Sequence, residues 1–195
     1  MKEYKKLPQF MGGWFIDRTL TDDLIKIFHE KKEWQNPGML GNKFIKETHK
    51  KSTDMSISPT ILEQPFQKYT MTIVDCVKRY YKKYKFADTD MYLNGIYVPY
   101  NIQWYKPKEG FYCWHFERSD FHRTGDRHLV FMTYLNDVKN GGTEFFYQKK
   151  KVPAKKGLTI IWPADWTFTH KGVISNKEDK YIATGWITFN KNERV

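Results

Sequence analysis

Cysteines and long apolar runs are the scarcest features of this sequence. Cys76 and Cys113 are the two cysteines in 195 residues, which is too few for a disulfide framework. No run approaches the roughly 18 apolar residues that a membrane span needs, and residues 1–6 (MKEYKK) lead into no apolar stretch typical of a secretory signal. We therefore expect a cytoplasmic protein in a reducing compartment, with no membrane anchor.

Proline and glycine are sparse as well, at 8 and 12 residues spread along the chain. Hydrophobic residues make up 40% of the sequence and aromatic residues 17%, which is typical of a globular protein and excludes a disordered or low-complexity chain. A chain of 195 residues can bury one core but has little room for a second. We therefore expect a single domain over residues 1–195.

Acidic residues are outnumbered, since 22 Asp and Glu face 33 Lys and Arg, for a formal net charge of +11. Such a charge is typical of a protein that binds nucleic acid, of one with an acidic protein partner, or of a well-solvated surface. The lysines are scattered in short groups, as at 50–51, 82–83 and 149–151. Charge alone leaves these three interpretations open.

The first part of the chain, about residues 1–90, has the spacing of helices. Thr21-Asp22-Asp23 can cap a helix that continues to about Lys32, and a second helix is predicted from about 65 to 84. The inner stripe of the second helix is typical of core packing rather than of a cofactor site: Phe66, Tyr69, Ile73, Val77 and Tyr80. The polar segment 36–58 is predicted to be a mobile loop with at most short strands.

From about 91 to 190 the sequence changes to short segments rich in β-branched and aromatic residues, separated by turn residues such as Asn140-Gly141-Gly142. The predicted strands are 91–98, 102–106, 111–117, 127–135, 143–147, 158–162, 167–172 and 181–189. About eight short strands after two helices predict an α+β, mainly β fold. We expect a jelly roll (double-stranded β-helix) with the N-terminal helices packed outside.

His115 and Glu117 are the first candidates for chemistry. Side chains at positions i and i+2 of a strand project from the same face, so the two point together if 111–117 is a strand. An imidazole and a carboxylate are two of the three ligands of the facial triad, which binds Fe(II) and leaves positions open for cosubstrate and oxygen. A His-x-Glu pair is common by chance, so a site also needs a third ligand from another strand.

His170, in a second aromatic segment, is the candidate third ligand, although it can also be a polar residue near a strand end. Four other histidines fit less well, because they lie in the first helix, in polar or loop segments, or beside no carboxylate at this spacing: His29, His49, His122 and His128. Lys180 opens the apolar segment 181–189 and can hold one end of a dicarboxylate as a point charge. Taken alone, it can equally be an exposed lysine in a lysine-rich chain.

A series of short motifs follows in one order along residues 102–189. They are Trp104-Tyr105-Lys106-Pro107, Gly110, Tyr112, His115-Phe116-Glu117, Tyr134-Leu135-Asn136-Asp137, Gly141-Gly142-Thr143-Glu144-Phe145, Lys155-Lys156-Gly157, Phe168-Thr169-His170, Lys180-Tyr181 and Thr184-Gly185-Trp186. In this order the series resembles the prolyl 4-hydroxylase branch of the Fe(II)/2-oxoglutarate dioxygenases. That branch includes the oxygen-sensing prolyl hydroxylases and short phage-type members.

The resemblance implies a dioxygenase that uses Fe(II), 2-oxoglutarate as cosubstrate and ascorbate as a reductant. The implied iron ligands are His115, Glu117 and His170. The residues implied around the cosubstrate are Lys180 and the Tyr134 hydroxyl at its remote carboxylate, Tyr105 and Tyr112 in the pocket, and Thr184 and Trp186 beside the metal.

Two positions depart from the family pattern. Glu117 stands where the family usually has Asp, and its extra methylene requires a different rotamer or a small backbone shift to reach the metal. Asp120 is an alternative ligand, but its position predicts a loop after the strand, so we favour Glu117. Lys180 stands where many relatives have Arg. A lysine offers a single charged ammonium there, whereas an arginine can bind a carboxylate through two parallel N–H groups.

The resemblance favours hydroxylation of a prolyl residue in a peptide or protein, in the manner of a procollagen-proline 4-dioxygenase. The basic surface then favours acidic stretches around the target proline. One alternative is the same chemistry on a nucleic-acid methyl group or a free amino acid. Against nucleic acid, demethylases of the superfamily carry a second arginine a few residues past the anchor, and residues 181–186 contain none. The other alternative is an inactive jelly-roll module that only binds metal.

Overall fold

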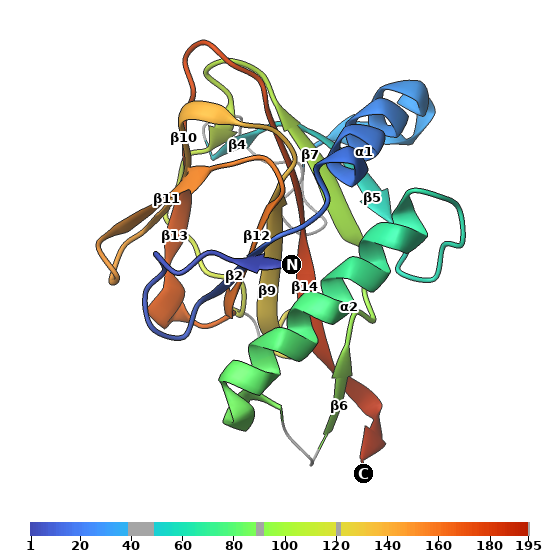
Figure 1. The fold of residues 1–195 in the computed structure, drawn as a ribbon, viewed down its shortest axis with the longest axis vertical. Helices are drawn as coiled ribbons and strands as arrows, with labels where there is room; N and C mark the ends of the chain where they lie inside the picture. The colour runs from blue at the N-terminus through green and yellow to red at the C-terminus, as the bar shows by residue number, and fades with distance from the viewer. Residues whose placement is uncertain (39–48, 89–91, 120–121, 195) are drawn as a thin grey trace.

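The computed structural model describes residues 1–38, 49–88, 92–119 and 122–194, and its centre is a large antiparallel sheet (Figure 1). Within these residues the sheet has nine strands: β1 (Lys2–Glu3), β2 (Gly12–Phe15), β3 (Gln35–Pro37), β5 (Thr53–Ile57), β6 (Tyr92–Gly95), β7 (Tyr100–Tyr105), β9 (Arg127–Tyr134), β12 (Leu158–Pro163) and β14 (Lys180–Arg194). Their order is β1-β2-β12-β9-β14-β7-β5-β3, and β6 pairs with β14 beside this path.

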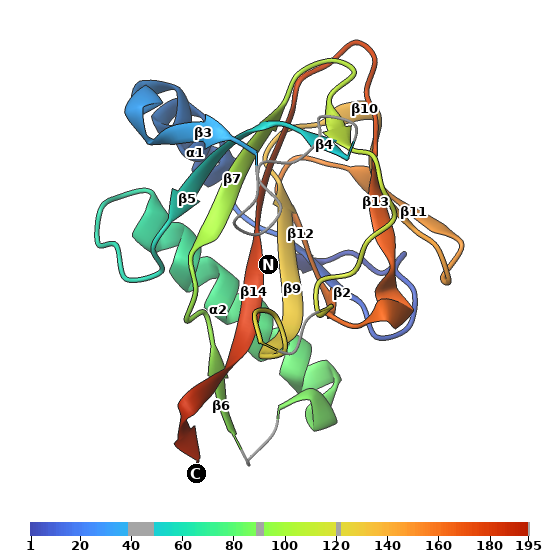
Figure 2. The same cartoon turned by 180° about the vertical axis from the view of Figure 1, so that it is seen from behind.

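A smaller sheet packs against this one. It contains β10 (Val138–Phe145), β11 (Lys150–Ala154) and β13 (His170–Val173) in the order β11-β10-β13. A further pair, β4 (Lys50–Lys51) with β8 (Gly110–Phe111), lies near one end of the two sheets in both views (Figures 1 and 2). An apolar core between the sheets includes Met132, Phe145, Val152, Ile160 and Trp162. This two-sheet arrangement is the predicted jelly roll.

Two helices, α1 (Arg18–Glu30) and α2 (Phe66–Lys83), cover the other face of the large sheet (Figure 1). The predicted stripe of α2 is buried there together with apolar side chains of β5, β7, β9 and β14. Three short 3-10 helices complete the fold: η1 (Lys32–Trp34), η2 (Lys85–Ala87) and η3 (Trp166–Phe168). No helix in the described part of the chain is long and apolar enough to cross a membrane.

The first helix begins earlier than its sequence predicts. Asp17 is the N-cap, because its carboxylate accepts a hydrogen bond from the Thr19 amide at 3.0 Å. Thr21 is buried inside the helix, where its hydroxyl donates to the Arg18 carbonyl at 2.7 Å. The predicted cap at Thr21 is therefore wrong, although the apolar face of the helix was assigned correctly.

The polar segment 36–58 contains more strand than predicted. Strand β5 pairs with β7 over the whole of residues 53–57 and buries Met55 and Ile57, so polar and apolar side chains alternate there. Part of the expected loop, residues 39–48, lies outside the described residues.

The predicted strand 111–117 is mostly irregular. Regular pairing stops at Phe111, and only an isolated antiparallel bridge joins His115 to His170. Likewise the predicted strand 167–172 begins only at His170, after the helical turn η3.

Candidate metal centre

Two backbone hydrogen bonds hold His115 and His170 side by side. The amide of each donates to the carbonyl of the other, at 3.0 and 2.9 Å. Each imidazole is also oriented by its own segment, since Nδ1 of His115 lies 3.1 Å from the Cys113 carbonyl and Nδ1 of His170 lies 2.9 Å from the Phe168 carbonyl. A carbonyl can only accept, so Nδ1 carries the proton and both Nε2 lone pairs are available to a metal ion.

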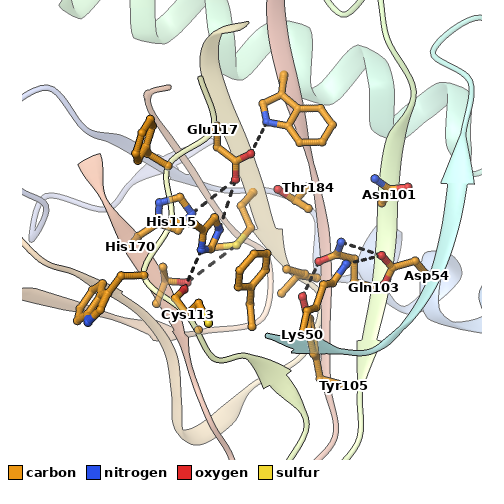
Figure 3. A pocket seen from close by; sticks show the side chains of 18 of the residues that line it. Lys50, Asp54, Asn101, Gln103, Tyr105, Cys113, His115, Glu117, His170 and Thr184 are labelled. Carbon is orange, nitrogen blue, oxygen red and sulfur yellow. Dashed lines mark hydrogen bonds and ion pairs between the residues drawn. The ribbon is translucent and has the colours of Figure 1, made fainter. Parts of the chain in front are cut away.

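Glu117 completes the group from the same irregular segment as His115. Its Oε1 lies 3.6 Å from His115 Nε2 and 3.7 Å from His170 Nε2, and the three ligand atoms all lie within 4.8 Å of one another (Figure 3). Such separations suit atoms that ligate one ion through bonds of about 2.0–2.2 Å. Two imidazole nitrogens and one carboxylate oxygen are the donor set of non-haem Fe(II) sites, so these residues fit that ion.

Burial and neighbouring charges set the protonation of this group. Burial disfavours the imidazolium of His170, and the adjacent His115 adds to this effect, so the pKa of His170 falls to about 3. Burial also opposes ionisation of Glu117, but His115, His170 and Arg127 outweigh it and lower the pKa of Glu117 to about 2. At neutral pH the site therefore offers a neutral His170 and a carboxylate, which can bind a cation without first losing protons.

The second oxygen of Glu117 is held by two residues of the large sheet. Oε2 accepts from Trp186 Nε1 at 3.0 Å and from Arg127 Nη1 at 3.1 Å. The Arg127 guanidinium also lies over the Trp186 ring, 3.6 Å from its centroid, and donates to the Glu117 carbonyl. Trp186 thus lies beside Glu117, one of the three candidate metal ligands. No sequence motif pointed to Arg127, which is ten residues beyond Glu117 in the chain.

Lys180 lines the same cavity as the three ligands, a space of about 780 Å³. It is 4% exposed, its Nζ donates to the Val173 carbonyl at 3.1 Å, and the ammonium lies 4.9 Å from the Tyr105 ring centroid. Burial lowers its pKa to about 8, so the side chain is a cation at neutral pH. A buried ammonium that faces a cavity fits the free carboxylate of a bound dicarboxylate.

Three other predicted pocket residues line the cavity: Tyr105, Tyr134 and Thr184. The Tyr134 hydroxyl donates to Thr143 Oγ1 at 2.8 Å, and the Thr184 hydroxyl donates to the Phe131 carbonyl at 3.1 Å. Their hydroxyl groups are therefore already hydrogen-bonded to the protein.

Tyr112 is not brought into the cavity. Its hydroxyl donates to the Lys108 carbonyl at 2.9 Å, and its amide donates to the His49 carbonyl at 2.9 Å. In a regular strand Tyr112 would lie on the face opposite His115 by alternation, and in this irregular segment too it does not line the cavity.

A chain of buried polar groups forms the opposite wall of the cavity (Figure 3). The Lys50 ammonium lies 2.5 Å from Asp54 Oδ2, which also accepts from Gln103 Nε2 at 3.1 Å. Gln103 in turn accepts from the Tyr105 hydroxyl at 2.7 Å. The sequence analysis missed Lys50, Asp54 and Gln103. The sequence feature that could have indicated Asp54 is the alternation of polar and apolar residues over 53–57, which is typical of a strand rather than a loop.

Of the remaining histidines, His49 lines the cavity, whereas His29, His122 and His128 do not. Asp120, the alternative ligand considered from the sequence, lies outside the described residues.

Comparison with known proteins agrees with this geometry. Residues 100–188 match the model of the 2OG-Fe(II) oxygenase superfamily. No curated protein sequence matches the chain. Among solved structures, the chain is similar to a Pseudomonas putida prolyl-4-hydroxylase, with a TM-score of 0.68 and 16% identity over 93% of each chain.

Two further similar structures come from a virus and from Trichoplax adhaerens. One is a viral collagen prolyl hydroxylase from Paramecium Bursaria Chlorella virus-1, with a TM-score of 0.66 and 20% identity over 92% of this chain and 96% of that one. The other is a Trichoplax adhaerens prolyl hydroxylase in complex with a hypoxia inducible factor peptide, with a TM-score of 0.70 and 13% identity over 92% and 83% of the two chains. The likeness to prolyl-hydroxylase-like 2-oxoglutarate oxygenases that the sequence indicates is thereby confirmed, and these structures show the shared fold.

Proposed function

We propose that residues 1–195 form one catalytic domain that uses 2-oxoglutarate and O2 to hydroxylate a prolyl residue of a peptide or protein. The observation that carries this proposal is a single cavity that joins two kinds of site. It holds a cluster of two histidines and a glutamate, and it also holds a buried lysine that can bind a carboxylate.

His115, Glu117 and His170 would hold Fe(II) through two Nε2 atoms and Oε1. When bound, Fe(II) together with 2-oxoglutarate and O2 supplies the oxidising power to place oxygen on an unactivated C–H bond, with succinate and CO2 as coproducts. Trp186 and Arg127 keep Oε1 of Glu117 directed at the two histidines, because they occupy Oε2. This contact lets the longer glutamate serve where relatives use aspartate.

Lys180 would bind the remote carboxylate of 2-oxoglutarate. The ammonium is buried and donates to the Val173 carbonyl, and within the described residues it forms no ion pair, so a carboxylate of the cosubstrate would supply its negative partner. Tyr134 also lines the cavity, where its hydroxyl donates to Thr143, and the Tyr105 ring covers the ammonium. Exclusion of water by the bound cosubstrate would strengthen the charge pairing.

The prolyl substrate is supported by the motif order in residues 102–189 and by the shared fold with prolyl hydroxylases. A cavity of about 780 Å³ has room for 2-oxoglutarate and one further side chain. The net charge of +11 supports a peptide with acidic residues around the target proline.

The test is anaerobic titration of the protein with Fe(II) and 2-oxoglutarate, followed by turnover on a diverse array of proline-containing peptides. We expect substrate-dependent succinate and a gain of one oxygen atom in a proline-containing fragment, by mass spectrometry. His170→Ala should abolish both signals while circular dichroism remains unchanged. Turnover with methylated oligonucleotides, and none with peptides, would contradict the prolyl assignment. Metal binding without any turnover would favour an inactive module.

A further inference from the structure

Four aromatic side chains form a continuous exposed row next to the metal centre. The row consists of Trp114, Phe146, Tyr147 and Trp166, which are 39%, 53%, 55% and 58% exposed. Neighbouring ring centroids are 5.1, 5.1 and 5.6 Å apart along this series. Ten large hydrophobic side chains are exposed within the described residues, so four of them gather in this single row. Gathering of this kind is typical of a binding surface rather than of scattered surface residues.

The aromatic row is built on the same backbone as the metal centre. Trp114 directly precedes His115 and lines the catalytic cavity. The Phe146 amide donates to the Thr169 carbonyl at 2.9 Å, and Thr169 directly precedes His170. The row thus runs from the cavity wall to the outer surface, and its inner end cannot move without moving the residues beside two metal ligands.

The outer end of the row is also held in place. Gln148 Nε2 donates to the Thr167 carbonyl at 2.9 Å, which ties the β10–β11 turn to η3. Lys149 closes that turn with a φ of 47°, and its amide donates to the Phe146 carbonyl at 3.2 Å. The two backbone segments that carry Tyr147 and Trp166 are therefore held together, and the two rings are in contact, which reduces the ordering needed when a partner binds.

We propose that the aromatic row docks an extended, proline-containing segment of the polypeptide whose target residue enters the cavity. The inference rests on the proposed function for the identity of its partner. Adjacent rings meet nearly edge to face, with interplanar angles of 82°, 81° and 83°. Rings in this arrangement form corners with apolar walls, which suit compact groups such as pyrrolidine rings in a polyproline II chain. At about 3.1 Å per residue, the row suits a segment of roughly five residues.

The same geometry favours a polypeptide over single-stranded nucleic acid. Successive bases stack on open aromatic faces, whereas the rings here block one another's faces edge-on, and Lys171 covers Trp114 with its Nζ 4.3 Å from the centroid. The nearby lysine charge is partly compensated, since Glu144 lies 3.8 Å from Lys171 and 4.0 Å from Lys151. Lysines at the β10–β11 turn still favour acidic residues in the docked segment.

The test compares Tyr147→Ala and Trp166→Ala with Phe86→Ala, a matched truncation of an aromatic residue that is 91% exposed in η2. The full chain is loaded with Mn(II) and 2-oxoglutarate. Its binding to a fluorescein-labelled 16-residue peptide of repeated Pro-Ala-Pro-Glu is followed by fluorescence anisotropy. We expect each row variant to raise Kd at least tenfold, and Phe86→Ala to change it less than twofold.

Turnover with Fe(II) gives a second measurement. The row variants should raise KM for the 16-residue peptide and leave kcat within twofold. The wild-type protein should have a lower KM for this peptide than for the tripeptide Ala-Pro-Ala, and the row variants should lose that difference.

Other results would contradict either the docking inference or the proposed function, and the two cases can be told apart. Hydroxylation of the long peptide with unchanged KM in both row variants overturns the inference and leaves the proposed function in place. Row-dependent peptide binding without hydroxylation supports the inference and contradicts the proposed function. The inference is also overturned if wild-type protein does not bind the peptide, or if the row variants lose only oligo(dT) binding. Loss of self-association on sedimentation, with peptide binding retained, overturns it as well. Two independent single variants, each checked by circular dichroism, guard against a folding defect in one.

Discussion

Glu117 divides its two carboxylate oxygens between two tasks. Oε1 faces the imidazoles of His115 and His170, and Oε2 is held by Trp186 and Arg127. The orientation of the metal-facing oxygen therefore depends on two residues that would not touch the metal. Contacts of this kind commonly change metal affinity by about 10–100-fold when they are lost.

Replacement of Trp186 by phenylalanine should weaken metal binding without unfolding the protein. The variant keeps an aromatic ring under Arg127 but loses the N–H that donates to Glu117. We expect the Kd for Mn(II), measured by electron paramagnetic resonance titration, to rise about tenfold or more. Trp104→Phe is the matched control, since its indole N–H donates to Asp179 outside the cavity. Equal effects in the two variants would mean that Oε2 of Glu117 needs no fixed partner.

Binding of 2-oxoglutarate should weaken above about pH 8. Burial lowers the pKa of Lys180 from 10.5 to about 8, so the free protein carries the ammonium below that pH and loses it as the pH rises. Since the dicarboxylate binds the charged form, we expect Kd from calorimetry on Mn(II)-loaded protein to rise about fivefold between pH 8 and pH 9. Lys180→Arg should bind 2-oxoglutarate with little pH dependence over this range, because arginine stays charged. A flat profile in the wild type would place the carboxylate elsewhere.

At the scale of elements, the short strand β4 links the polar wall of the cavity to the metal centre. It pairs with β8, whose Phe111 stacks on the His115 ring at a centroid distance of 3.6 Å. On its other side, Lys50 forms the buried ion pair with Asp54 of β5, with side chains 3% and 13% exposed. Two residues of β4 thus connect an edge of the large sheet to a metal-ligand side chain.

Removal of Asp54 should destabilise the fold strongly. Asp54→Ala leaves a buried ammonium without its partner, which typically costs about 3–5 kcal/mol. We expect a loss of that size in the free energy of unfolding from urea denaturation. The combined change Lys50→Met and Asp54→Leu should cost much less, because no buried charge is left unpaired. Lys51→Ala in the same strand is the control: Lys51 is 47% exposed and lies 3.9 Å from Glu109, so its loss should cost under about 1 kcal/mol. A small effect of Asp54→Ala would show that water reaches Lys50.

At the scale of the whole molecule, the two faces of the large sheet have separate roles. The helices α1 and α2 pack on one face (Figure 2). Side chains of the other face and of the small sheet line the cavity. The core under the helices can therefore hold the large sheet in place while the cavity side stays open to ligands. The net charge of +11 is a property of the whole chain, and it attracts any negatively charged partner that approaches the protein.

The net charge of +11 should make encounter with acidic peptides dependent on salt. We expect kcat/KM for a proline peptide with acidic flanks to fall at least about fivefold between roughly 0.02 and 0.3 M salt, because the Debye length shortens from about 20 to 6 Å. A peptide of the same length with neutral flanks should change less than about twofold. Parallel salt curves for the two peptides would show that the surface charge does not steer the substrate.

The sequence alone determined the features that depend on residues close together. The apolar stripe of α2, the alternating strands of the second half and the motif order along residues 102–189 depend on local spacing. The jelly roll and the group of His115, Glu117 and His170 were therefore predictable. Local spacing also led to errors where a backbone departs from regular geometry, as at the Asp17 cap and the irregular residues 112–117.

Only the tertiary structure decided the contacts between residues far apart in the chain. It determined that Arg127 holds Glu117, that Lys50 and Asp54 form a wall of the cavity and that Trp114 meets Phe146. The physical reason is that these contacts depend on strand register and on the course of the connecting segments. Those are set by the packing of the whole core, and no short stretch of sequence specifies them.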